Sequence, residues 1–423
     1  MTSRDFIDPP SPETRPIEHA RALNQQAKAL SDQGRTQEAL RIWEQIVDVY
    51  GEQTDPALAP EVAAALVAKG TALERSDQVD EALEAFRAAR RHLSRQEVRD
   101  NSDWPSQLLA FALLREGFLL GRLSRAEEAI VAYEELVSRF RDHIDPTVSQ
   151  YVSDALLSEA YWVAIAGDYE RPMALYHKVI KRTRDSSCPR ERAALVRALV
   201  NSGSTLKLLG RYDEAMLSFD EALETLKVTA TDHGLEDELS ATLFNRAVIL
   251  KEWGRRSEAA AAFHDVAEQF ASARDVEIQS RVVWAISSEA SLLDEMDDPE
   301  AAILRFDDAV DLFGSSTDPR VEIHVAWALT NKGVVLSELS RHDEAVTTFS
   351  DCVLRYAHVD NASTLEAVAR ALLYKAMALD ELGLESAAND VCQELKERFA
   401  GNPQPAIRTV LDEARDFRRR QSD

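Results

Sequence analysis

Glycine and proline are scarce in this chain, at 14 residues each among 423. Sheets need tight turns, and disordered segments are rich in both residues, so the scarcity argues against either class. Hydrophobic residues make up 45% of the chain and charged residues 29%. That balance favours soluble helices.

Cysteine is scarcer still. The three residues Cys188, Cys352 and Cys392 are odd in number and show no CxxC spacing, and two of them stand at core-type positions. They are therefore expected to be buried thiols in a reducing compartment. No apolar run approaches the roughly 20 residues that a membrane span needs, and the N-terminus has no signal-peptide core. Together these absences predict a cytoplasmic protein.

Motifs that carry chemistry are also missing. The 9 histidines are scattered, without HExxH or any pair at helical ligand spacing. GxxxxGK[ST], a GxGxxG after a strand, GxSxG and a Cys/His constellation are all absent. The sequence therefore predicts no catalytic residue, no metal and no cofactor, in a protein that is not an enzyme.

Basic residues are outnumbered, with 49 Lys and Arg against 74 Asp and Glu, for a formal charge of −25. Such a charge repels nucleic acid and anionic membranes and favours cationic partners. An acidic excess is also an ordinary route to solubility, and both interpretations stay open. We expect a protein or peptide partner with basic character, no direct nucleic-acid contact and no membrane contact; the oligomeric state is not predicted.

Repetition is what the chain has in abundance, and the segment GRYDEAMLSFDEAL at 210–223 is representative of it. A small residue is followed twelve positions later by Ala, or once by Pro172, and four positions beyond that by an aromatic residue in every unit but the last. The small residues are Ala27, Gly70, Gly117, Ala160, Gly203, Ala247, Ala290, Gly333 and Ala376. Successive units are 43 residues apart, apart from one interval of 47 and one of 44. A small residue is what a helix needs where another helix crosses closely.

Each unit also contains a turn, at Gly34, Asp77, Ser124, Gly167, Gly210, Gly254, Asp297, Ser340 or Gly383. Gly can end a helix in the left-handed conformation, while Asp and Ser can cap the next one. Three junctions between units carry Asp55-Pro56, Asp145-Pro146 and Asp318-Pro319, where Asp suits the cap and Pro the first helical position. Each unit is thus predicted to be a helical hairpin.

The pattern resembles that of the tetratricopeptide repeat family over roughly residues 18–400. The usual period is about 34 residues, so the surplus here suggests lengthened first helices, as in longer-period relatives such as kinesin light chain and bacterial members. The resemblance implies an all-α, right-handed superhelical solenoid of nine hairpins with a C-terminal capping helix.

The remaining segments complete the expected domain organisation. Residues 1–17 are expected to be a disordered Pro-rich leader, 18–403 the solenoid of nine hairpins, and 404–423 the capping helix with a basic tail. An irregular junction near 94–107 contains Trp104-Pro105, which predicts a longer loop. Pro172 predicts that its helix begins late; a functional kink is the alternative.

In this family the first helix of each hairpin lines a concave groove, and that places several rows of residues there. Two positions before the small residue, the five regular units carry Asn201, Asn245, Ser288, Asn331 and Tyr374. Asparagine offers both a donor and an acceptor, so such a row could hold an extended peptide by its backbone, as in kinesin light chain and bacterial peptide-pheromone receptors. Alternatively, the amides satisfy neighbouring helix ends or water.

Two further rows lie on the same face. One turn earlier come Arg197, Ala241, Trp284, Trp327 and Arg370. Trp284 and Trp327 are expected to stack at the groove wall as binding anchors, or else to pack as structural spacers. Further along the helices come Glu252, Glu295, Glu338 and Glu381. An acidic row would select a basic peptide, although exposed Glu is common on any helix.

These rows predict a non-enzymatic scaffold that binds a peptide or protein segment in its groove. One alternative is a regulatory sensor whose solenoid changes pitch when it binds a small peptide and so controls a separate effector. Another is a structural subunit that uses its convex faces within a larger complex.

Overall fold

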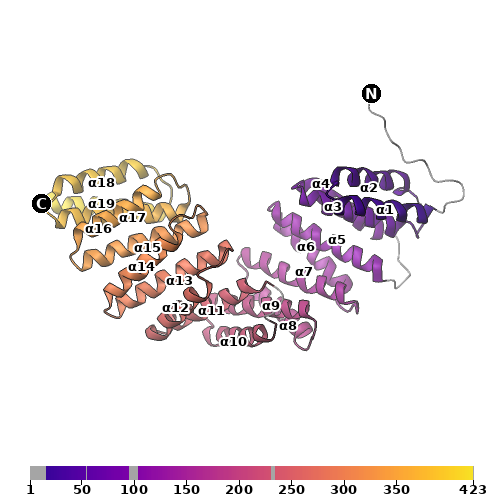
Figure 1. The fold of residues 1–423 in the computed structure, drawn as a ribbon, viewed down its shortest axis with the longest axis horizontal. Helices are drawn as coiled ribbons and strands as arrows, with labels where there is room; N and C mark the ends of the chain where they lie inside the picture. The colour runs from indigo at the N-terminus through magenta and orange to yellow at the C-terminus, as the bar shows by residue number, and fades with distance from the viewer. Residues whose placement is uncertain (1–15, 54, 95–102, 230–233, 423) are drawn as a thin grey trace, which may run out of the picture. The chain divides into compact units, whose positions relative to one another are not determined.

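A computed structural model describes residues 16–53, 55–94, 103–229 and 234–422. These residues form 19 α-helices and no strand, which confirms the predicted all-α fold of helical hairpins (Figure 1). The helices are α1 (Pro16–Asp32), α2 (Thr36–Tyr50), α3 (Ala59–Arg75), α4 (Val79–Ser94), α5 (Asp103–Arg122), α6 (Ala126–Phe140), α7 (Pro146–Ile165), α8 (Glu170–Thr183), α9 (Pro189–Leu208), α10 (Tyr212–Thr229), α11 (Glu236–Glu252), α12 (Arg256–Phe270), α13 (Val276–Glu295), α14 (Pro299–Phe313), α15 (Pro319–Glu338), α16 (His342–Arg355), α17 (Ala362–Glu381), α18 (Glu385–Phe399) and α19 (Pro405–Ser422). Odd-numbered helices up to α17 are the first helices of hairpins, and even-numbered helices are the second.

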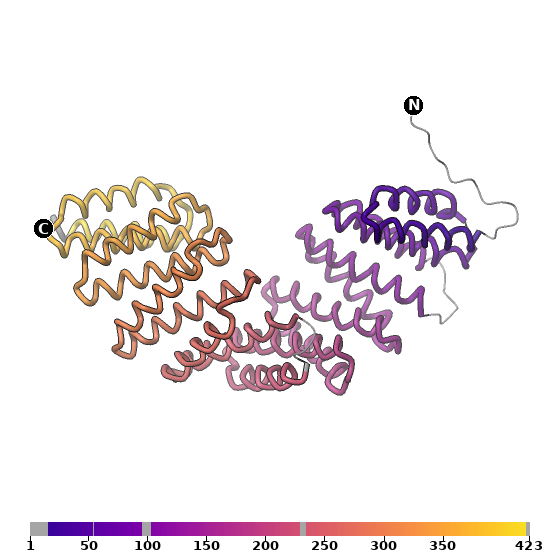
Figure 2. The backbone as a smooth tube through the Cα atoms, viewed as in Figure 1, coloured from indigo at the N-terminus to yellow at the C-terminus, as the bar shows by residue number. Residues whose placement is uncertain are grey.

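The chain divides into two compact units, Met1–Thr205 (unit 1) and Leu206–Asp423 (unit 2), with the boundary inside α9. Within unit 1, the first helices α1, α3, α5 and α7 pack in a row; α2, α4 and α6 each pack between two of them, and α8 packs against α7. In unit 2 the first helices α11, α13, α15 and α17 form a second row, with α12, α14 and α16 each between two of them; α10 packs against α11, and α19 against α17 and α18 (Figure 2). The outward surface of each row of first helices is called here the first-helix face of that unit.

The repeated small residues explain which side of a first helix faces inward. A Cβ on Gly117 would lie 2.5 Å from the Tyr133 ring, and one on Gly70 would lie 3.0 Å from the Phe86 ring. Both rings are fully buried. Because each residue turns a helix by about 100°, the position two residues earlier points away from this contact. The packing therefore directs the predicted rows toward the first-helix face.

The ends of the helices correct one prediction and support another. Asp77, Ser124, Asp297 and Ser340 have φ angles between 58° and 68°. They therefore adopt the left-handed conformation that glycine takes in the other turns, and the role of capping residue predicted for them is wrong. The capping predicted at two junctions is confirmed, because carboxylate oxygens of Asp145 and Asp318 accept hydrogen bonds from backbone N–H groups of α7 and α15.

At Asp55 the same prediction fails. Helix α3 begins only at Ala59, and the Asp55 carboxylate accepts a hydrogen bond from the N–H of Ala57 within the preceding turn. Here the chain makes an extra turn before the helix, so Asp55 stabilises the turn and not the helix end.

Two prolines, Pro172 and Pro105, lie in the first turn of their helices. Helix α8 begins at Glu170, which places Pro172 third in the helix, whereas Ala259 is fourth in α12. The predicted late start is confirmed, because a first-turn N–H has no intrahelical partner to lose. Trp104 and Pro105 likewise occupy the first turn of α5, and the loop expected before them falls on residues 95–102, outside the described residues.

The predicted ends of the chain are described only in part. Helix α1 starts at Pro16, inside the expected leader, and residues 1–15 lie outside the described residues. Cys352 and Cys392 are buried and Cys188 is half-buried; all three thiols are free. Among the described residues, no helix has the length and apolar character that crossing a bilayer would require.

Candidate functional site

The predicted asparagine row lies on the first-helix face, but its members differ in availability. Asn245 accepts a hydrogen bond of 2.6 Å from the Nζ of Lys207 through its Oδ1 atom. Ser288 is only 8% exposed. Asn331 is half-buried, and its amide makes no hydrogen bond within the described part of the chain. Tyr374 is half-buried with its ring 6.1 Å from that of Phe349. In unit 2 the row therefore offers one available asparagine side chain.

Trp284 is an exposed aromatic side chain of this face in unit 2. Its indole is 47% exposed. It packs at 4.7 Å from the ring of Phe244 on α11 and stacks at 5.4 Å, nearly parallel, on the ring of His324 on α15. The predicted stack between Trp284 and Trp327 is wrong, because the neighbouring helix presents His324, one turn before Trp327, at this point.

His324 and Trp327 play supporting roles beneath this surface. Burial lowers the pKa of His324 to about 4, so the imidazole is neutral near pH 7. Trp327 is half-buried and packs against the hydrophobic core of unit 2. The Trp327 indole is thus largely covered, whereas Trp284 presents its ring to solvent.

All four members of the acidic row are exposed. Glu295 accepts a hydrogen bond of 2.9 Å from the Nε of Arg256. Glu338 and Glu381 make no ion pair within the described residues. The pKa of Asp294 is raised, first by burial and then by the adjacent charge of Glu295. Negative potential therefore collects at the ends of α13, α15 and α17.

The remaining predicted residues either lie in unit 1 or interact with neighbouring side chains. Arg197 and Asn201 are exposed residues of unit 1. Burial raises the pKa of Asp154, and the positive charge of Arg197 partly opposes that rise, so these two side chains are electrostatic neighbours. Arg370 donates from its Nε to the Glu366 carboxylate at 3.1 Å on its own helix. Glu252 is close enough to raise the pKa of Lys207 against the larger lowering by burial.

A set of ion pairs between adjacent hairpins was not predicted from the sequence. The residue directly before the small position pairs with the residue five positions after the Ala of the preceding second helix. The ion pairs are Lys69 with Glu44 at 2.9 Å, Glu116 with Arg87 at 3.0 Å, Arg246 with Asp220 at 3.0 Å and Lys332 with Asp307 at 2.5 Å, and at the same positions Glu289 and His264 are hydrogen-bonded at 3.1 Å. Because opposite charges recur at these two positions of the repeat, the pairs could have been predicted from the sequence.

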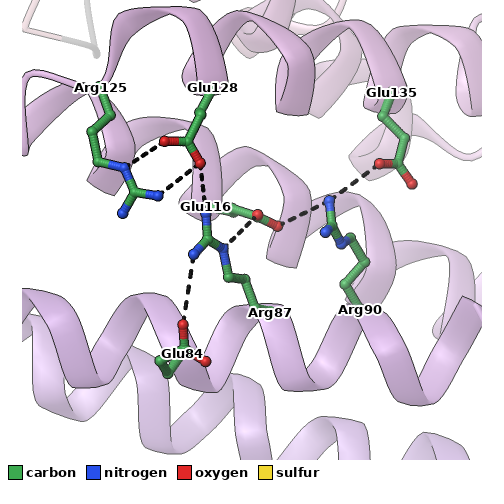
Figure 3. Close-up of polar contacts among 7 residues, drawn as sticks. All are labelled: Glu84, Arg87, Arg90, Glu116, Arg125, Glu128 and Glu135. Atoms are coloured by element: carbon green, nitrogen blue, oxygen red, sulfur yellow. Dashed lines mark hydrogen bonds and ion pairs between the residues drawn. The ribbon is translucent and has the colours of Figure 1, made fainter.

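Glu116 is the most enclosed example, and its side chain is 4% exposed. Figure 3 shows its carboxylate between Arg87 and Arg90 of α4, with Glu84, Glu128 and Glu135 around the two guanidinium groups. The first helix supplies the cation at Lys69, Arg246 and Lys332 but the carboxylate at Glu116 and Glu289, so mismatched hairpins would bring like charges together at some junctions. Each contact therefore joins a first helix to the second helix of the preceding hairpin.

Unit 1 also has an open cavity of about 380 Å³ at the start of its first-helix face. Its lining residues are Arg21, Asn24, Gln25, Lys28, Glu61, Ala64 and Trp104. The Glu61 carboxylate accepts a hydrogen bond of 2.9 Å from the Nε of Arg21, and the Asn24 Nδ2 donates to the Glu61 carbonyl oxygen at 3.0 Å. In the part of the chain that the structure describes, no cluster of His, Cys, Asp and Glu could hold a metal ion.

Comparison with known proteins identifies the repeats and the fold. Tetratricopeptide repeat profiles match residues 24–96 and 196–225, and a profile of anaphase-promoting complex subunit 5 matches residues 71–158. No curated protein matches the chain.

Several solved structures share the fold at low sequence identity. The apo quorum sensor NprR from B. thuringiensis is 12% identical, with 90% of this chain and 98% of NprR covered at a TM-score of 0.53. Apo RapI is 13% identical, with coverage of 91% and 99% and a TM-score of 0.58. A signal-transduction ATPase with a tetratricopeptide repeat sensor, from Pyrococcus horikoshii, is 13% identical, with coverage of 89% and 52% and a TM-score of 0.50. At such identities the likeness shows a common solenoid fold.

Proposed function

Since the chain belongs to the tetratricopeptide repeat family, we propose that it is a non-enzymatic binding protein that holds an extended, basic peptide segment on the first-helix face of unit 2. The observation that carries the proposal is the ring of Trp284, which is half exposed yet held between Phe244 and His324. An aromatic ring fixed before binding loses little entropy when a ligand covers it, which is typical of binding anchors.

The chemistry of α15 suggests how a peptide would lie. His324, Asn331 and Glu338 follow one another at intervals of seven residues, which is close to two helical turns and about 10 Å. The distance along α15 from His324, which stacks on Trp284, to Glu338 is therefore about 21 Å. Roughly six residues of an extended peptide span that length. A peptide of that length would meet an aromatic anchor, an amide that can donate and accept, and a carboxylate.

Charge supports a basic ligand in particular. Glu338 and Glu381 carry no neutralising partner among the described residues, and Glu295 already raises the pKa of its neighbour Asp294. A Lys or Arg side chain of the ligand would meet this potential, and an arginine could also stack on the exposed Trp284 indole. An acidic ligand would be repelled by the same carboxylates.

A selection experiment tests the proposal. A random dodecapeptide library displayed on phage is selected against the full chain, and the enriched peptides are measured by fluorescence anisotropy against wild type and Trp284→Ala. We expect basic peptides whose affinity falls at least tenfold, about 1.4 kcal/mol, in the variant. The double variant Glu338→Lys, Glu381→Lys should weaken the same peptides and reduce the salt dependence of their binding.

Trp253 provides the matched control, because it is also an exposed tryptophan of unit 2 but lies at the C-terminal end of α11. The Trp253→Ala variant should bind within twofold of wild type, and unfolding midpoints should show that all variants are folded. If Trp284→Ala binds every enriched peptide as tightly as wild type does, the proposed site is wrong. Enrichment of acidic peptides that depend on Trp284 would refute the charge preference.

The regulatory-sensor alternative differs in what happens after binding. The similarity of the fold to NprR, which is a quorum sensor by its description, is the reason to test it. Small-angle scattering with and without an enriched peptide separates the two functions, because a sensor should change its dimensions and a rigid scaffold should not. A structural subunit that uses second-helix surfaces would instead lose assembly on mutations outside the first-helix face.

A further inference from the structure

Large apolar side chains are exposed on two neighbouring first helices of unit 1. Phe118 on α5 is 45% exposed, and Tyr161 and Ile165 on α7 are 57% and 58% exposed. Helices α5 and α7 pack directly against each other, as Figure 1 also shows. We call Phe118, Tyr161, Trp162 and Ile165 the aromatic patch.

The patch is held in place by the helices beneath it. The indole of Trp162 lies over the backbone of Gly121 on α5, where any Cβ would overlap it. The ring of Tyr161 meets Trp162 edge-on at 5.2 Å, and the Arg115 guanidinium covers the Phe118 ring at 4.5 Å. The Nε of Arg115 donates a hydrogen bond of 3.1 Å to the Glu74 carboxylate, and this contact fixes the guanidinium. These rings are therefore positioned before any partner arrives.

The equivalent positions in unit 2 have a different character. Tyr161 and Ile165 stand one and five residues after the small residue Ala160, and in α13 and α15 those positions hold Ser291 with Glu295 and Val334 with Glu338. Exposed aromatic side chains at adjacent equivalent positions are thus a local feature of α5 and α7. Clustered exposed apolar groups of this kind mark interaction sites.

Arginines stand on α3 and α5 beside the patch, and two of them, Arg115 and Arg122, pair with Glu74 and Asp77. Arg75, at the corresponding position of α3, is exposed and makes no ion pair within the described residues. Arg122, at that position of α5, reaches Asp77 at 2.7 Å, with the Asp77 side chain 83% exposed. Such a surface pair contributes little, so a carboxylate of a partner could replace Asp77. The row that carries Glu in unit 2 therefore carries Arg75, Arg122 and Ile165 in unit 1.

We propose that the aromatic patch binds a protein segment in which aromatic or long aliphatic side chains are flanked by Asp or Glu. The apolar side chains would cover Tyr161 and Ile165, and the carboxylates would pair with Arg75 and Arg122. The proposal is independent of the binding proposed for unit 2, and the two faces would prefer ligands of opposite charge. One chain could then join an acidic segment to a basic one.

The same dodecapeptide library tests this second face in the full chain. Peptides are selected on the double variant Trp284→Ala, Glu338→Lys, which removes the competing site proposed in unit 2. They are then measured against three further variants made on that background. Tyr161→Ser with Ile165→Ser removes the apolar contacts, Arg75→Glu with Arg122→Glu reverses the charge, and Val131→Ser is the control. Val131 is 59% exposed in the same unit but lies on the second helix α6.

We expect enriched peptides that combine Asp or Glu with Phe, Trp or Leu. Their affinity should fall at least tenfold in the first two variants and stay within twofold in Val131→Ser. Basic peptides, or acidic peptides that ignore both double substitutions, would overturn the proposal. Analytical sedimentation of the unliganded chain tests whether a second copy of the chain covers the patch instead. A dimer that dissociates in the variant Tyr161→Ser, Ile165→Ser would show this and would also overturn the proposal.

Discussion

The buried carboxylate of Glu116 gives a stability prediction whose magnitude follows from its surroundings. Glu116 accepts a hydrogen bond of 3.0 Å from Arg87, and its other oxygen lies 3.4 Å from Arg90. Removing one partner of a buried ion pair costs about 3–5 kcal/mol when the remaining charge is left uncompensated. Here Arg87 keeps Glu128 at 3.2 Å and Arg90 keeps Glu135 at 3.2 Å (Figure 3). The expected loss for Glu116→Gln is therefore smaller, about 2 kcal/mol, close to one hydrogen bond to a charged group.

Hydrogen exchange measured by mass spectrometry suits this prediction because a stacked array opens locally. In Glu116→Gln, the protected amides of α5 should exchange about 30-fold faster, which corresponds to about 2 kcal/mol. Amides of unit 2 serve as the internal reference. The control is Glu84→Gln, whose exposed carboxylate lies 3.6 Å from Arg87 and should contribute less than about 0.5 kcal/mol. If both variants change exchange equally, the buried pair does not stabilise the contact between these hairpins.

Two further predictions concern unit 2 and the small positions. Burial lowers the pKa of His324 from its ordinary value of 6.5 to about 4. As the pH falls, the imidazole of the unfolded chain is therefore protonated before that of the folded chain. The free energy of unfolding of unit 2, measured in urea, should therefore fall as the pH drops from 6.5 to 4, by at most about 3 kcal/mol from this group, and a His324→Asn variant should lack that component. Gly117→Ala should destabilise unit 1 by about 1 kcal/mol in urea unfolding, because overlap with Tyr133 outweighs the gain in helix propensity. Gly70→Ala, with 3.0 Å of clearance from Phe86, should be close to neutral, and an equal loss in both would contradict the packing argument.

The hairpins could be predicted because their determinants recur within one unit. A small residue and the aromatic residue sixteen positions later must face each other for the two helices to pack, as the contact of Gly117 with Tyr133 shows. The ends of the helices followed from local chemistry where Asp precedes Pro, and failed at Asp77 and Ser340, because a left-handed turn residue and a capping residue can be the same amino acid.

Contacts between hairpins were harder to predict. Trp284 meets His324, forty residues away, although equivalent positions are 43 residues apart. Phe111 and Tyr151 in unit 1 show the same separation. Neighbouring first helices are thus displaced by about three residues, so equivalent residues on the shared face are offset from one another by nearly one turn. No property of a single repeat specifies that displacement.

This displacement has a consequence for recognition. Three residues of a helix span about 4.5 Å, so a row of equivalent side chains steps along the helix axes as it passes from one hairpin to the next. A peptide that crosses the helices squarely would therefore meet different repeat positions in turn, such as the Trp284 ring on α13 and then His324 on α15. Specificity then depends on combinations of non-equivalent residues. For that reason, the Glu positions of unit 2 and the aromatic patch of unit 1 can differ in ligand preference while the packing of every hairpin stays the same.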